Sequence, residues 1–117
     1  MGMDLVRQGG HWRSNRAGWS LLRGLALEHG WIPEGTAPPS WLSPAEQWDG
    51  NYSTNDGQTV SASDAQHLAD ALERALRDPE VIAFLRCRSE GGQDSDNCEV
   101  FVRDFVSFGR AGDFLII

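Results

Sequence analysis

Residues that bind transition metals are scarce in this chain of 117 residues. Its two cysteines, Cys87 and Cys98, do not form a Cys-x-x-Cys pair, and its three histidines lie far apart in the sequence. Zinc and related ions need several such ligands at close spacing, so we expect no metal and no cofactor. Reduced thiols are the default for a cytoplasmic protein, and a Cys87–Cys98 disulfide is the less favoured alternative.

The polar stretch from Asp49 to Asp64 contains Asn, Asp and Gly residues in an order that first suggests a calcium loop. A twelve-residue loop of the EF-hand type needs oxygen ligands at positions 1, 3 and 5, glycine at position 6 and an acid at position 12. Counting from Asp49 places Thr54 at the glycine position, and counting from Tyr52 misses the final acid by one residue. This register excludes such a loop.

Long apolar runs are missing as well. No stretch approaches the roughly 20 apolar residues that cross a bilayer, and residues 1–12 lack the apolar segment of a secretory signal. We therefore expect a cytoplasmic protein without a membrane partner. The length is typical of one domain, so residues 1–117 are interpreted as a single domain, either monomeric or homodimeric.

Positive charge is scarce, and the formal net charge is −7. Binding to a phosphate backbone requires a cationic surface, so no nucleic-acid partner is expected. Residues 1–23 nevertheless hold four arginines against one aspartate. A local basic patch near the N-terminus therefore remains an alternative.

Catalytic motifs are also absent. The sequence has no G-x-S-x-G elbow, phosphate-binding glycine loop or His-Glu-x-x-His pattern. His67 lies three residues from both Asp64 and Asp70 on a predicted helix, where either carboxylate is within reach. We favour an exposed surface histidine there and keep a small hydrolase using His67 as the weakest functional alternative.

Helical spacing of apolar residues is the clearest pattern that the chain does contain. It predicts helices over 15–29 and 65–77, a third from Pro79, and a fourth over 101–108. Ser61-x-x-Asp64 predicts a capping box for the second helix. Segment 33–49 is rich in Pro and Gly and predicts a long loop with a short helical turn starting at Ser43.

Two short segments predict the strands. Asn55-Asp56-Gly57 predicts a hairpin-like reversal over 52–60, and the apolar tail 114–117 is expected to pair with this region or with Trp31-Ile32. The predicted class is α+β and predominantly α, with about four helices and a minimal two- or three-stranded sheet.

All five tryptophans occur before residue 50. Trp19 and Trp31 are expected in the core, whereas Trp41 and Trp48 lie in the Pro-rich loop. An aromatic residue there either closes over the core, which we favour, or presents a binding surface. In the second case the loop forms an amphipathic patch suited to a protein partner or a sugar. Its members would be Trp41, Trp48, Tyr52, Asn55 and Gln58.

The chain resembles a family of small bacterial proteins that has no known function. The likeness rests on Ser14-Asn15 before a Trp-containing helix, on Asn-Asp-Gly-Gln-x-Val-Ser before an Ala/Leu-rich helix, and on an aromatic C-terminal pattern. Only the middle motif is specific. The resemblance implies a cytoplasmic bacterial domain and supplies no catalytic residues.

Acidic charge and a Trp-rich loop, without catalytic motifs, favour a non-catalytic protein-interaction module. An inhibitor or immunity-like protein that neutralises a basic partner is one concrete form of it. A small-ligand or sugar-binding domain that uses the Trp/Tyr-rich loop is the alternative.

Overall fold

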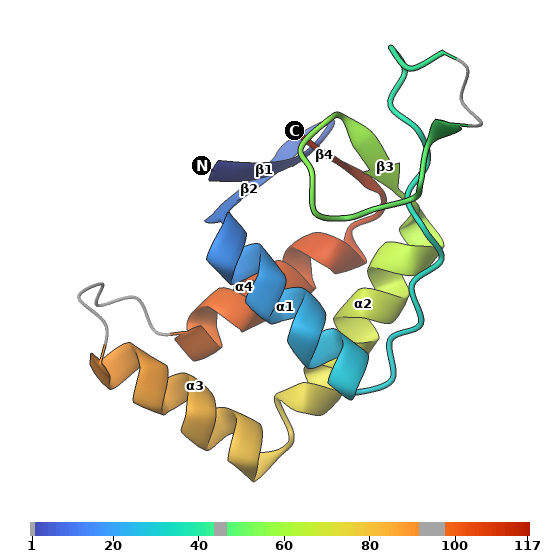
Figure 1. The fold of residues 1–117 in the computed structure, drawn as a ribbon. Coiled ribbons are helices and arrows are strands. Elements are labelled where there is room, and N and C mark those ends of the chain that lie inside the picture. The colour runs from blue at the N-terminus through green and yellow to red at the C-terminus, as the bar shows by residue number, and fades with distance from the viewer. Residues whose placement is uncertain (1, 44–46, 92–97) are drawn as a thin grey trace.

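The computed structural model describes residues 2–43, 47–91 and 98–117 and contains four helices and four strands within them (Figure 1). The predicted α+β class is confirmed, but the sheet has four strands rather than two or three. The elements are β1 (Gly2–Arg7), β2 (Gly10–Asn15), α1 (Arg16–Glu28), β3 (Gln58–Val60), α2 (Ala62–Ala75), α3 (Pro79–Gly91), α4 (Cys98–Arg110) and β4 (Phe114–Ile116).

The sheet has the strand order β2-β1-β4-β3, and all neighbouring strands are antiparallel. The β1–β2 hairpin was not predicted. Met3 and Leu5 are buried on one face while Asp4 lies on the other, and Gly9 has the positive φ of +81° that a tight turn needs. A glycine turn beside an alternating segment therefore marked this hairpin in the sequence.

The predicted hairpin over 52–60 is wrong. Only β3 is extended there, and it pairs with β4 on one side and through a single bridge with Ala37 on the other. Gly57 alone supplies a positive φ, of +92°, whereas Asn55 and Asp56 have negative φ values. The expected pairing of the C-terminal tail with this region is confirmed, and β4 also pairs with β1.

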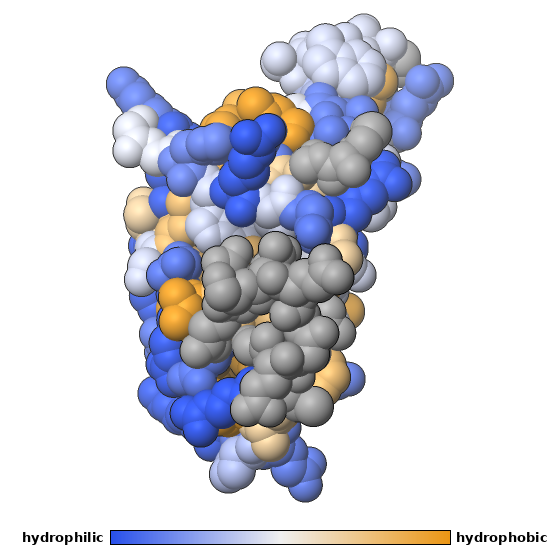
Figure 2. Space-filling model, turned by 90° about the vertical axis from the view of Figure 1, so that its left-hand side faces the viewer, coloured by the Kyte–Doolittle hydropathy of each residue, from blue (hydrophilic) through white to orange (hydrophobic). Residues whose placement is uncertain are grey.

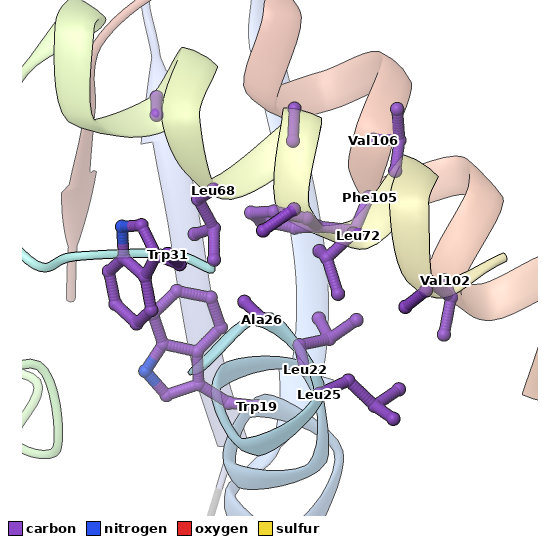
Figure 3. Packing of buried hydrophobic residues seen from close by; sticks show 14 of the residues in the cluster. Trp19, Leu22, Leu25, Ala26, Trp31, Leu68, Leu72, Val102, Phe105 and Val106 are labelled. Atoms are coloured by element: carbon purple, nitrogen blue, oxygen red, sulfur yellow. The ribbon is translucent and has the colours of Figure 1, made fainter. Parts of the chain in front are cut away.

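Local capping groups define the starts of α1 and α2. The side chain of Asn15 accepts a hydrogen bond from the backbone N–H of Gly18 at 2.7 Å, and Ser61 Oγ accepts one from Asp64 at 3.0 Å. Both are N-caps, which satisfy donors that the first turn leaves free. The leucine faces of the two helices meet around Trp19 and Trp31 (Figure 3).

Helix α3 lies at the end of the molecule opposite the sheet (Figure 1). Asp78 Oδ1 caps its start by accepting from the backbone N–H of Glu80 at 2.9 Å, and the helix extends to Gly91. The side chain of Cys87, and with it the possible Cys87–Cys98 disulfide, lies outside the described part of the chain, as do residues 44–46 of the helical turn expected from Ser43.

The buried hydrophobic side chains form one cluster, to which the sheet and the helices contribute. On the face shown in Figure 2, hydrophobic atoms occur as separate patches between hydrophilic areas. Within the described part of the chain, no helix combines the length and the apolar character required to cross a bilayer.

Candidate functional site

The loop between α1 and β3, residues 29–57, carries Trp41, Trp48, Tyr52 and Asn55, and Gln58 follows it in β3. Part of this loop projects from the body at the upper right of Figure 1. Four indole N–H groups bind into this loop or to its support, so tryptophan braces the segment. Their acceptors are Tyr52 O for Trp19 (2.6 Å), Asp64 Oδ1 for Trp31 (2.9 Å), Asp56 O for Trp41 (2.7 Å) and Thr36 Oγ1 for Trp48 (3.0 Å).

Asp64 anchors the base of the loop from the first turn of α2. Its carboxylate is fully buried and accepts hydrogen bonds from Trp31 Nε1 and from the Tyr52 hydroxyl. That hydroxyl in turn accepts from the backbone N–H of Gly35 at 2.8 Å. Burial, aided by the adjacent Asp64, raises the pKa of Tyr52 well above its usual value. The phenol therefore serves as a stable donor to the carboxylate.

The predicted capping box is only half right. Ser61 caps α2 as expected, but the Asp64 carboxylate turns toward the loop, because an indole N–H and a phenol O–H are available there. A buried carboxylate must have such donors, since an unpaired one is costly. Asp64 is therefore a structural link between α2 and the loop, a role that its local sequence did not indicate.

Gln58 is also fully buried and fastens the turn that precedes β3. Its Oε1 accepts from the backbone N–H of Asp56 at 2.9 Å, and its Nε2 donates to Thr54 O at 2.6 Å. Both the oxygen and the nitrogen of the amide are thus hydrogen-bonded within the protein. Gln58 shapes the turn and presents no polar atom to a partner.

Trp48 is half-buried and braces the middle of the loop. Its indole donates to both oxygens of Thr36, whose hydroxyl donates to Asn51 O at 2.7 Å. Asn55, another residue of the predicted patch, is half-buried. Thr36 was missed as a bracing residue, because threonine in a Pro- and Gly-rich segment carries no distinctive pattern.

Trp41 differs from the other bracing tryptophans because the residue remains 66% exposed. Its Nε1 is held by Asp56 O, and it lies beside Gly57, where an added Cβ would come within 4.0 Å of that nitrogen. The expected patch of five residues is therefore not one surface: Tyr52 and Gln58 are buried, whereas the ring of Trp41 points outward.

His67 lies on the exposed side of α2, and its Nδ1 is 3.4 Å from Glu34 Oε2. The carboxylates expected beside it are engaged elsewhere, Asp64 in the interior and Asp70 with Arg110 at 2.9 Å. Glu34, which the sequence did not indicate, also accepts a bond from Ser63 Oγ at 2.8 Å. In a catalytic triad the histidine lies between the hydroxyl and the acid. Here the acid, Glu34, lies between His67 and the Ser63 hydroxyl.

Comparison with known proteins produced no match: no family model, curated protein or solved structure corresponds to this chain.

Proposed function

We propose that this protein is a non-catalytic protein-interaction module of the inhibitor or immunity type, and that the ring of Trp41 lies in its contact surface. The observation that carries the proposal is a large aromatic side chain, 66% exposed, whose only polar atom already has an internal partner. What this side chain offers to a partner is apolar ring surface. Tryptophan is among the residues that most often dominate binding energy at protein interfaces.

Preorganisation supports the same proposal. The indole of Trp41 is tied to Asp56 O, and Asp56 N–H is tied in turn to the buried Gln58. A side chain fixed before binding loses less conformational entropy when the complex forms, which favours affinity. The internal hydrogen bonds of the loop thus contribute to recognition by holding one ring in place.

The net charge of −7 supports a basic partner. Opposite charge speeds association and selects among partners even where it adds little to the final affinity. An acidic protein with a fixed apolar anchor combines the two features that an inhibitor of a basic protein needs.

A sugar-binding function would use the same ring and is the less supported candidate. Sugars need several hydrogen-bonding groups beside a stacking aromatic, yet the polar atoms of Tyr52 and Gln58 bind within the protein. This use of the polar groups favours a protein partner.

Affinity purification from the native host tests the proposal, with wild type, Trp41→Ala and Ile32→Ala as baits. Ile32 is a matched control because it is 81% exposed and lies at the other end of the loop. We expect a specific host protein to be retained by wild type and Ile32→Ala, and its affinity for Trp41→Ala to fall roughly 30-fold, as for a hot-spot residue. Absence of any specific host protein, or equal retention by Trp41→Ala, would contradict it.

A further inference from the structure

A groove of about 420 Å³ lies between α1 and α3, at the end of the molecule away from the sheet. Leu25 and Val81 are almost fully buried beneath it, and Phe84 is 46% exposed at its side. The groove thus has an apolar floor. The residues that line it are Leu21, Gly24, Leu25, Glu28, His29, Asp78, Glu80, Val81 and Phe84.

The rim of the groove is acidic. Glu28 ends α1, Asp78 directly precedes α3 and Glu80 lies in its first turn, and the described lining contains no arginine. His29 lies between the two helices, and its Nε2 is 3.5 Å from Asp78 Oδ2. Glu28 and Glu80 are exposed and available to a cation.

Gly24 gives an independent indication that something approaches α1 closely. Glycine inside a helix costs about 1 kcal/mol relative to alanine. Gly18 in the same helix has an internal reason, since a Cβ there would lie 2.8 Å from Phe101 and 2.5 Å from Ser14 Oγ. A Cβ at Gly24 would meet nothing within 4 Å. The described chain therefore does not require glycine at position 24, whereas a backbone packed into the groove would.

We infer that the α1–α3 groove receives a basic amphipathic helix of a protein partner. The inference rests on the proposed function, because it assumes a protein partner, and it adds a second surface distant in sequence from Trp41. Amphipathic helices bind grooves between helices through apolar residues spaced three and four apart. Here those residues would pack over Gly24 and against Phe84, with flanking Lys or Arg side chains beside Glu28 and Glu80.

Titration with a fluorescently labelled Leu/Lys peptide tests the inference. The peptide is designed as an amphipathic helix, and a scrambled peptide of the same composition and charge is the comparison. We expect wild type to bind the amphipathic peptide at least about tenfold more tightly than the scrambled one. Gly24→Leu should weaken binding at least about tenfold, because the new side chain fills the groove without changing any charge.

Further variants separate the groove from general attraction between acidic protein and basic peptide. Gly24→Ala should weaken binding less than Gly24→Leu does, because its single methyl group fills less of the groove. Glu28→Gln with Glu80→Gln should weaken binding several-fold and reduce its salt dependence. Equal binding of the two peptides, or unchanged binding by Gly24→Leu, would overturn the inference. Trp41→Ala should bind the peptide like wild type, so failure here and failure of the proposed Trp41 contact give different results.

Discussion

The loop from residue 29 to 57 and the α1–α3 groove differ in which of their side chains already have contacts within the protein. At the base of the loop, the buried side chains of Gln58 in β3 and Asp64 in α2 hydrogen-bond to loop residues. At the groove, apolar side chains such as Phe84 remain partly exposed, and Gly24 meets open space. Internal hydrogen bonds thus occupy these polar groups and leave apolar surface of the loop exposed at Trp41 and Ile32, whereas the groove keeps apolar surface between two helices.

The largest expected effect follows removal of the carboxylate that anchors the loop. Asp64→Ala leaves the Trp31 indole and the Tyr52 hydroxyl without their buried acceptor, so the free energy of unfolding should fall by roughly 2 to 5 kcal/mol. Urea denaturation measures the change. Asp70→Ala, which removes an exposed partner of Arg110, should cost less than about 1 kcal/mol. Equal losses would refute the anchoring role of Asp64.

A smaller loss is expected from the turn before β3. Gln58→Ala removes the amide that binds Asp56 N–H and Thr54 O, so the unfolding free energy should fall by about 1 to 3 kcal/mol. Asn55→Ala, in the same turn, should change it by less than about 0.5 kcal/mol. Thermal unfolding of both variants measures the two losses of stability. A larger loss for Asn55→Ala would contradict the role of Gln58 in fixing this turn.

Tyr52 should make stability depend on alkaline pH. Its pKa is raised by burial and by Asp64, so the folded state retains the phenol proton to higher pH than the unfolded state does. The stabilisation is complete below about pH 10 and should decline above it by about 1.4 kcal/mol per pH unit. Denaturation at several alkaline pH values tests this, with Tyr52→Phe lacking the contribution.

Because Tyr52 is the only tyrosine, tyrosinate absorbance gives an independent check. The phenol should ionise only together with unfolding. Its ionisation near pH 10 in a protein that remains folded would contradict the buried Tyr52–Asp64 contact.

A substitution at the groove should stabilise the protein, in contrast to the substitutions at Asp64 and Gln58. Gly24→Ala should raise the unfolding free energy by about 0.8 to 1 kcal/mol, because alanine favours the helix and its Cβ has space. Gly18→Ala should lower it, since Phe101 and Ser14 occupy the corresponding position. Denaturant unfolding of the pair measures both signs, and a loss at Gly24 would mean that α1 needs this glycine for its own folding.

The helical features that depend on neighbours in sequence were predicted, whereas the local β1–β2 hairpin was missed. The cap at Ser61 and the leucine spacing of α2 lie within a few turns of one helix, so the sequence shows them directly. The pairing of β1 with β4 joins opposite ends of the chain, and no local pattern specifies that contact. The site followed the same rule: Trp41 stood out as an aromatic in a loop, but the bonds between Asp64, Trp31 and Tyr52 form only after distant segments meet.

Footprinting of tryptophan oxidation by hydroxyl radicals tests the central claim most directly, namely that the loop braces its indoles internally and presents the ring of Trp41 to a partner. In the free protein Trp41 should react far faster than Trp19 and Trp31, which are 1% and 4% exposed. In the complex with the host partner, its rate should fall while the rates of the buried rings stay unchanged. Slow oxidation of Trp41 in the free protein, or an unchanged rate in the complex, would contradict the account.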